Sequence, residues 1–326
     1  MRKLLIAIGL LLALCLHAME WSDETQVSLL TCTPGEELYA RYGHTAIRIC
    51  DPKNGTDWVF NYGIFDFNTD HFYWKFVRGE TWYMLGAATL DNFLYEYRRE
   101  HRPVYEQVLN LTPDQRERMI EALLVNYQPE NRTYLYNFVF DNCATRPYRL
   151  IQSVLGDSIR STYQGAEGKT YRRFIQRYTG IGSWADFGIE LLFGRRSQHK
   201  MQGEERLFLP EELMSYMSEA TLSDGTPVVR KEHIEHFDIR PIPWYKTWFM
   251  GIGLIVLALV AISIYDRRRG RVSRWLDILF AVLYCLLLAL VCFLTFFSIH
   301  PLVGFGIRLF LILLVYICIR SIAYFR

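Results

Sequence analysis

The sequence predicts an exported α+β domain, built on one antiparallel sheet with helices, followed by a membrane domain of three helices. Three observations support this fold class. The chain opens on a basic and then apolar stretch, which is the pattern of a secretory signal. Short alternating segments between turn residues, and then segments of helical periodicity, fill most of the remaining chain. Three long apolar stretches follow residue 245.

The first segment, residues 1–18, has the layout of an export signal. Two basic residues precede an apolar run from Leu4 to Leu16. Ala18 is acceptable as the last residue before cleavage, whereas Leu16 is larger than the small residue usually found two positions earlier. The segment is therefore either removed or kept as an anchor, and in both cases the chain after it is expected outside the cytoplasm.

Alternating apolar residues and turn signals predict the sheet. Strands are expected at 26–32, 43–51, 58–67 and 102–111. The second and third of these form a hairpin around the turn PKNGTD. The aromatic segment 71–88 predicts two further short strands or an aromatic flap.

The clearest helix covers 112–127, with Thr112 as its N-cap, Pro113 as its first residue and Gln115 as the reciprocal capping-box residue. Its buried stripe is expected at Ile120, Leu123, Leu124 and Tyr127. Other helices are expected after the NCATR segment to about residue 155 and near 170–178, 185–193 and 210–219. Residues 194–206 predict a surface loop.

The C-terminal region, 244–326, is expected to cross a membrane three times. The spans are predicted at about 247–265, 275–298 and 301–319. The loop DRRRGRVSR between the first two spans carries five arginines in nine residues, and positive loops stay cytoplasmic. This topology places residues 19–243 outside as one domain and the C-terminus in the cytoplasm.

One arginine, Arg308, falls inside the third predicted span. At 1.5 Å per residue it would lie about 12 Å from the outer end of that helix. An intramembrane arginine is a candidate functional residue, here for a phospholipid phosphate. The alternative, given equal weight, is that the side chain of Arg308 extends to the membrane–water interface and has no such function.

The composition excludes one class of partner. The 326-residue chain has a formal net charge of +2 and no basic tail or Arg-rich helix, so nucleic acid is not expected as a partner. His233 and His236 lack a third ligand, which favours a solvated face over a metal site. The sequence has no GxSxG elbow, which argues against serine hydrolase chemistry. No metal or cofactor is expected.

The positions of the cysteines leave one thiol of the exported domain as the candidate for chemistry. Four of the seven lie in apolar segments: Cys15, Cys285, Cys292 and Cys318. The exported part holds Cys32, Cys50 and Cys143, an odd number that leaves at least one unpaired. If the first two pair, or pack in neighbouring strands, Cys143 is the thiol that remains.

Cys143 occupies a position that suits a nucleophile. In YNFVFDNCATRPYRL, residues 136–150, a strand-like run precedes it and a helical pattern follows, with Asp141 or Asn142 as cap. A helix N-terminus stabilises a thiolate, and its free N–H groups suit an oxyanion. Pro147 disturbs the first turn of this helix. The alternative is a buried structural cysteine.

A base and an orienting group precede this thiol in the chain. His44 lies on a strand after a glycine that leaves room beside its ring, and an imidazole there suits a general base. A satisfied structural histidine is the alternative. Asn61, on the partner strand, is the candidate for orienting the imidazole, with Asp66 in reserve, although the sequence leaves open which face Asn61 occupies.

The motifs RYGHTAIRI, FNYGIFDF and YNFVFDNCATR, in this order, resemble the exported domain of the Lnb-type bacterial lipoprotein N-acyltransferases. VSLLTCTPG and FLPEEL extend the resemblance over most of residues 26–215, and FFSIHP adds a local likeness in the membrane part. That domain is similar to circularly permuted NlpC-like and lecithin:retinol-acyltransferase-like thiol enzymes. In them the histidine strand precedes the cysteine helix.

The resemblance implies a permuted papain-like fold in the periplasm, held at the bacterial inner membrane. It also implies a phospholipid acyl donor, a thioester on Cys143, His44 as base, and a diacylated lipoprotein as acceptor. The aromatic stretch 71–83 would then either line an acyl groove or belong to the sheet core. Two other functions use the same exported domain: a cell-wall cysteine peptidase or amidase of NlpC-like type, and a non-enzymatic membrane sensor.

Overall fold

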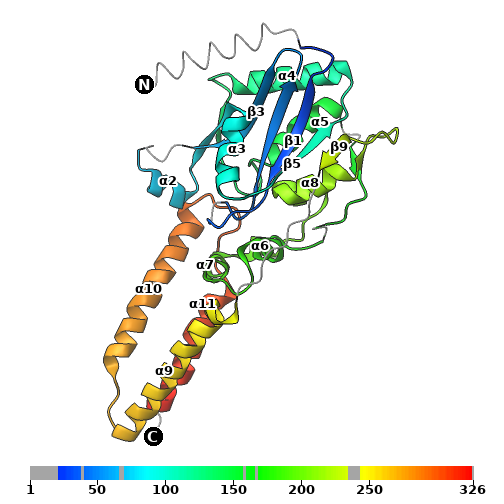
Figure 1. The fold of residues 1–326 in the computed structure, drawn as a ribbon. Helices are drawn as coiled ribbons and strands as arrows, with labels where there is room; N and C mark the ends of the chain where they lie inside the picture. The colour runs from blue at the N-terminus through cyan, green and yellow to red at the C-terminus, as the bar shows by residue number, and fades with distance from the viewer. Residues whose placement is uncertain are drawn as a thin grey trace. The chain divides into compact units, whose positions relative to one another are not determined.

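The computed structural model describes residues 21–37, 40–65, 70–156, 159–165, 168–233 and 243–324 (Figure 1). The predicted signal segment and Asp66 lie outside these residues. The chain divides into two compact units, which are described separately. The first comprises Met1–Phe76, Glu80–Gly168 and Met201–Phe237, and the second comprises Val77–Gly79, Lys169–Lys200 and Asp238–Arg326.

An antiparallel sheet organises the first unit. Its strand order in the described residues is β6-β4-β3-β2-β1-β5-β9. The strands are β1 (Gln26–Cys32), β2 (His44–Asp51), β3 (Thr56–Ile64), β4 (Trp82–Thr89), β5 (Val104–Leu109), β6 (Thr133–Leu135) and β9 (Val229–His233). A separate pair joins β7 (Arg160–Ser161) to β8 (Ala220–Thr221).

The sheet carries apolar side chains on both faces because helices pack on both. The helices of this unit are α2 (Phe72–Arg78), α3 (Leu90–Arg99), α4 (Pro113–Tyr127), α5 (Thr145–Leu155), η2 (Gly203–Phe208) and α8 (Pro210–Ser218). The last two residues of α2 belong to the second unit. Val27 and Leu29 of β1 join the main core with α4 and α5, whereas Leu30 and Cys32 join a smaller cluster with Phe93 of α3. The side-chain period of two along a strand produces this division.

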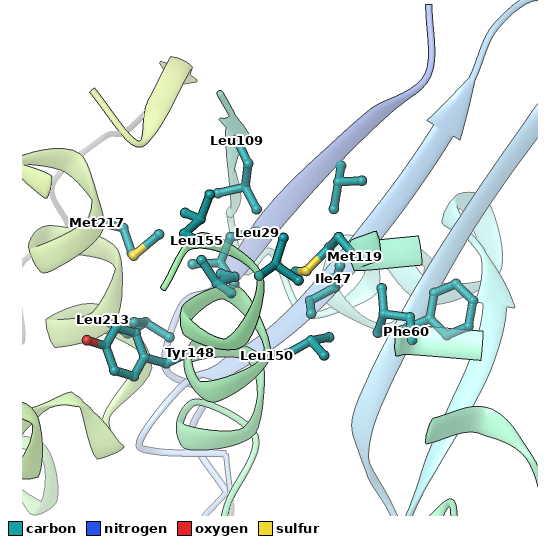
Figure 2. Packing of buried hydrophobic residues seen from close by; sticks show 14 of the residues in the cluster. Leu29, Ile47, Phe60, Leu109, Met119, Tyr148, Leu150, Leu155, Leu213 and Met217 are labelled. Atoms are coloured by element: carbon teal, nitrogen blue, oxygen red, sulfur yellow. The ribbon is translucent and has the colours of Figure 1, made fainter. Parts of the chain in front are cut away.

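The main core lies between the sheet and its helices (Figure 2). Leu29, Ile47 and Phe60 come from the strands, and Met119 and Leu150 come from α4 and α5. All five are buried. This core fixes α5 against the sheet, and Cys143 lies just before the first turn of α5.

The structure confirms the elements with strong local patterns. The strand predicted at 26–32 is β1, and the predicted hairpin is β2–β3, with β3 beginning two residues earlier than expected. In α4, Thr112 Oγ1 accepts from the Gln115 N–H at 3.3 Å, and Gln115 Oε1 accepts from the Thr112 N–H at 2.9 Å. The predicted stripe of α4 is buried, together with Met119.

Three predicted segments differ from the structure. Segment 71–88 forms α2 and one strand, β4, and α2 has no buried residue. The run 136–140 is a turn after β6, closed by a bridge between Asn137 and Asp141, because Asn137 Oδ1 accepts from two N–H groups inside the turn. Residues 194–206 lie mostly at the surface, as predicted, but they form the 3₁₀ helix Arg195–Gln198 and the start of a second, Gly203–Phe208, and they bury Ser197 and Met201.

The second unit combines the three long apolar helices with a small helical segment. It contains α6 (Tyr171–Thr179), α7 (Trp184–Leu192), η1 (Arg195–Gln198), η3 (Trp244–Lys246), α9 (Trp248–Arg269), α10 (Arg274–Phe297) and α11 (Ile307–Tyr324). The last three are long and apolar enough to cross a membrane. Segment 169–200 groups with them and not with the sheet.

The third span begins later than predicted. Residues 301–306 form a loop, and the helix starts at Ile307. The Gly194 N–H donates to Leu302 O at 2.9 Å, and the Gly304 N–H donates to Leu192 O at 3.0 Å. Gly194 and Gly304 approach so closely that a Cβ on Gly194 would lie 2.6 Å from Gly304 Cα. This backbone pairing holds the segment outside the helix.

Candidate active site

Cys143 is held in a tight turn by the residue before it. Asn142 is 2 % exposed, and its Oδ1 accepts from the N–H groups of Ala144 and Thr145 at 2.8 and 2.9 Å. Its Nδ2 donates to Phe138 O at 2.6 Å and to Phe208 O at 2.8 Å. Asn142 therefore caps the start of α5, as one of the two predicted caps, and also ties the turn to the FLPEEL segment.

A second contact closes the loop around the thiol. Arg146 donates to both carboxylate oxygens of Asp141 at 2.8 and 2.7 Å, and its guanidinium lies 3.7 Å from the ring centroid of Tyr134. A bidentate pair of this kind fixes direction as well as distance. Pro147 is the third residue of α5. The N–H groups on either side of it make helical bonds, from Arg146 to Asn142 O at 3.1 Å and from Tyr148 to Ala144 O at 3.2 Å, so the missing N–H of Pro147 costs the bond to Cys143 O, as the sequence predicted.

His44 and Asn61 meet on one face of the hairpin. The register pairs Arg48 with Val59, so even-numbered residues of β2 share a face with odd-numbered residues of β3. His44 Nε2 and Asn61 Oδ1 are 2.6 Å apart, and the Gly63 N–H donates to the same oxygen at 2.8 Å. The sequence did not determine on which face of the hairpin Asn61 lies, and in the structure it lies on the same face as His44.

The room for this ring comes from Gly63 rather than from the glycine before His44. A Cβ on Gly63 would lie 2.6 Å from His44 Cε1 and 2.9 Å from Asn61 Oδ1. Gly43 has another role: its φ is +74°, and a Cβ there would lie 2.6 Å from Cys32 O. Both glycines are needed, and Gly63 is the one that shapes the site.

The imidazole also contacts the thiol. A hydrogen bond joins the side chains of His44 and Cys143. Because Nε2 faces Asn61, Nδ1 is the nitrogen left for the sulfur. The structure therefore brings together Cys143, His44 and Asn61, the three catalytic residues predicted from the sequence.

The electrostatics of the pair favour charge separation. Burial raises the pKa of Cys143, but the charge of His44, its hydrogen bond and the N–H groups of Thr45 and Cys143 outweigh burial, so the pKa lies below the ordinary value. Burial lowers the pKa of His44, but the charge of Cys143 and the bonds to Cys143 and Asn61 outweigh it, so that pKa is raised. A thiolate beside an imidazolium is the expected resting state.

The N–H groups available to an oxyanion differ from those expected. The N–H groups of Ala144 and Thr145, at the start of α5, are taken by Asn142. The backbone N–H groups that reach the sulfur are those of Thr45 and Cys143 itself. Thr45 follows His44 in β2, so one strand supplies both the base and a donor.

A second thiol in the neighbourhood is not activated. Cys32 lies directly opposite His44 in the β1–β2 ladder, whereas Cys50 is paired with Gln26 at the other end of the same hairpin. Cys32 and Cys50 are both free and lie in the neighbouring strands β1 and β2, which is the second of the two predicted alternatives. Burial raises the pKa of Cys32 to about 12, although hydrogen bonding to Tyr97 and the charge of Arg102 oppose it.

Three tyrosines lie near enough to Cys143 for its charge to raise their pKa values, and the sequence did not predict them. Burial raises the pKa of Tyr83 to about 12, and the charge of Cys143 raises it further. Burial and the same charge also raise the pKa values of Tyr134 and Tyr136. The density of aromatic residues near 134–140 was the only signal in the sequence, and it was interpreted as a strand.

Arg308 lies at the first turn of α11, not deep within a span. Its guanidinium forms an ion pair with Glu190 of α7, and it donates to Glu190 O at 3.4 Å. The carboxylate of Glu190 is buried and also binds Arg172 of α6. Contact of Arg308 with a lipid phosphate stays a prediction, and its observed role is to join α7 to α11.

The domain and its site define a protein with a thiol–imidazole pair on an α+β domain and with three helices able to span a membrane. Residues 20–177 match the family model described as the Lnb N-terminal periplasmic domain. The matched range contains His44, Asn61 and Cys143. The match supports an Lnb-type membrane protein with a periplasmic domain. No curated protein and no solved structure gives a match.

Proposed function

We propose that this protein is a membrane-bound N-acyltransferase that forms an acyl thioester on Cys143. The observation that carries the proposal is the bonding of one imidazole, His44, to both Cys143 and Asn61. A thiolate with a depressed pKa is a nucleophile near neutral pH, and an oriented imidazolium supplies the proton that the leaving group needs. The family match and the apolar helices favour lipids over soluble substrates.

In the first step the Cys143 thiolate attacks the carbonyl carbon of a phospholipid ester. The carbon–oxygen bond to glycerol breaks, and the imidazolium of His44 gives its proton to the departing oxygen. The products are a Cys143 thioester and a lysophospholipid. We assign stabilisation of the oxyanion between these states to the backbone N–H groups of Thr45 and Cys143, because both act on the sulfur.

In the second step the α-amino group of a diacylated lipoprotein attacks the thioester. The imidazole of His44, now neutral, takes a proton from this amine as the carbon–sulfur bond breaks. An amide forms, and the thiolate and the imidazolium are restored. Asn61 keeps the ring in one orientation through both steps.

The order of the residues supports a permuted papain-like arrangement. The strand with His44 and the strand with Asn61 precede Cys143, and α5, which follows the cysteine, packs against the sheet. In this arrangement the domain works in the periplasm at the inner membrane. The second unit, with its three apolar helices, keeps it near both lipid substrates.

Intact mass spectrometry tests the proposal. The full-length protein is incubated with micelles of phosphatidylethanolamine and phosphatidylglycerol, beside the variants Cys143→Ala and His44→Ala. The wild type should gain one fatty-acyl mass that hydroxylamine removes, Cys143→Ala should gain none, and His44→Ala should gain it slowly. Cleavage of cell-wall peptides without any adduct would overturn the proposal in favour of a peptidase. If the wild type forms no adduct and cleaves no peptide, and cells with the Cys143→Ala protein behave like the wild type, the protein is a non-enzymatic sensor.

A further inference from the structure

Helix α2 presents an unusual surface. Its sequence, FYWKFVR, has no buried residue, and Tyr73, Trp74 and Phe76 are 80 %, 55 % and 54 % exposed. Lys75 places a positive charge among these aromatic side chains. Large aromatic residues together with a cation are typical of helices that lie in a membrane interface, whereas in water such a patch is unfavourable.

The end of α2 is bound to the loop between two membrane helices. The Ile299 N–H donates to Arg78 O at 2.8 Å, and His300 Nε2 lies 3.1 Å from Val77 O. A Cβ on Gly79 would lie 3.2 Å from Ile299 Cγ1. This loop joins α10 to α11 at the ends opposite the arginine-rich loop, and Val77, Arg78 and Gly79 belong with it to the second unit.

A row of aromatic rings leads from α2 to the active site. Phe76 stacks on Phe72 with centroids 6.2 Å apart, and Phe72 stacks on Phe65 at 6.1 Å. Phe65 lies 4.9 Å from Tyr83, which stacks on Tyr136 at 4.2 Å. All five rings belong to the first unit. The last two rings lie close enough to Cys143 for its charge to affect them.

We propose that α2 and this aromatic row form the path by which one acyl chain of a phospholipid passes from the outer leaflet to Cys143. The exposed side chains of α2 contact the lipid, and Phe72, Phe65, Tyr83 and Tyr136 offer the chain a continuous apolar surface. The inference rests on the proposed acyl transfer for its purpose. Lipid contact by α2 is testable without any transfer.

Photocrosslinking tests the contact by itself. The Cys143→Ala protein, which cannot form the thioester, is reconstituted in vesicles of phosphatidylethanolamine and phosphatidylglycerol that contain a phosphatidylethanolamine with a diazirine near the end of one acyl chain. Peptide mapping should find crosslinks within residues 65–83 as well as on the apolar helices. Crosslinks confined to α9, α10 and α11 would overturn the proposed path, whatever the activity of the wild type.

Single-turnover acylation tests the function of the path. The double variant Trp74→Ser/Phe76→Ser is compared with Tyr95→Ser, which removes an aromatic residue that is 67 % exposed on α3. With phospholipid vesicles the double variant should be slower by about tenfold or more, because two apolar contacts are lost, and Tyr95→Ser should match the wild type. With p-nitrophenyl butyrate, a short soluble donor, all three proteins should acylate Cys143 equally.

The two donors separate the two proposals. Equal rates of the double variant and the wild type on vesicles would overturn the path and leave acyl transfer intact. Wild type that reacts with p-nitrophenyl butyrate but not with phospholipid would contradict the proposed function, while the crosslinks would still report lipid at α2.

Discussion

Cys143 and Cys32 are two thiols of one neighbourhood with opposite acidities. Both are near His44, yet the pKa of Cys143 is lowered and that of Cys32 is raised to about 12. The difference arises because Cys143 has an imidazole and two N–H groups at its sulfur, whereas burial dominates at Cys32. Position relative to hydrogen-bond donors, and not burial alone, selects the nucleophile.

The pH dependence of alkylation follows from this difference. Only the thiolate reacts with iodoacetamide, and a lowered pKa keeps Cys143 ionised below the value of about 8.5 of an ordinary thiol. The alkylation rate at Cys143 should therefore reach half its maximum at a pH below that value, and His44→Ala should move the midpoint upward. Peptide mass mapping between pH 5 and pH 10 measures both. Equal midpoints in the two proteins would contradict the ion pair.

Gly63 has a steric role that can be tested by one methyl group. Gly63→Ala would place a Cβ 2.6 Å from His44 Cε1, so the ring must move away from Asn61 or from Cys143. We expect the acylation rate to fall about a hundredfold, as small displacements of catalytic groups produce, with little loss of thermal stability. Gly188→Ala, where a Cβ would meet nothing within 4 Å, is the matched control. Acylation at the wild-type rate would show that the ring position is not critical.

At the scale of elements, local patterns were sufficient for β1, β2 and α4. The capping box of Thr112 and Gln115 lies within four residues of sequence, and the structure forms it as predicted. The strand predicted just before Cys143 was wrong, because long-range contacts determine the conformation of segment 136–141. Asn142 donates to Phe208 O, and Arg146 binds Asp141 and packs on Tyr134. The predicted start of the third span was wrong for the same reason, because the loop 301–306 forms backbone hydrogen bonds with the end of α7.

The candidate site shows the same division. Residue type and motif predicted Cys143 as the nucleophile and His44 as the base, and the hairpin predicted Asn61 as the residue that orients the imidazole. The sequence could not give the steric need for Gly63, because that depends on where the imidazole of His44 lies against β3. It could not give the tyrosines near the sulfur either, because they depend on how the loop after β6 packs against β4.

The side chain of Asn142 makes four hydrogen bonds in the turn that holds Cys143. Asn142→Ala removes four hydrogen bonds and leaves two backbone N–H groups at the start of α5 without this partner. We expect the free energy of unfolding to fall by about 2 kcal/mol, as a lost cap and unsatisfied buried groups imply. Thermal unfolding measures this loss, and Asn131→Ala, at a side chain with one exposed bond to Val125 O, is the control. Equal losses in both variants would contradict the assigned role.

For the whole molecule, the membrane helices are held together by a buried ionic cluster. Arg320 of α11 is 3 % exposed and donates to Asp266 Oδ2 at 3.0 Å and to Asp277 Oδ1 at 2.7 Å. Tyr316 also donates to Asp277 Oδ1, at 2.7 Å. By residue type alone Arg320 would count as a positive charge near the C-terminus, but Asp266 and Asp277 neutralise it inside the bundle. The predicted topology therefore depends on the exposed arginines of segment 266–274, where α9 ends and α10 begins.

Removal of one partner should weaken the bundle. Arg320→Gln leaves two carboxylates without their cation, and loss of one partner from a buried pair typically costs about 3–5 kcal/mol. Thermal unfolding in a lipid nanodisc should show a clear loss, and Arg268→Gln, at an exposed position of the same positive region, should not. Comparable losses for the two variants would show that the cluster does not hold the helices together.

The central claim, that the thiol passes an acyl group to an amine, is tested most directly by a chase from isolated acyl-enzyme. Full-length protein is loaded with a ¹³C-labelled palmitoyl group from phosphatidylcholine, freed of lipid, and mixed with a synthetic diacylated lipopeptide whose N-terminus is free. The account predicts that the label leaves Cys143 and appears on the lipopeptide as a hydroxylamine-resistant amide, and that an N-acetylated lipopeptide gains nothing. Release of the label only as free fatty acid, at a rate that the lipopeptide does not change, would contradict it.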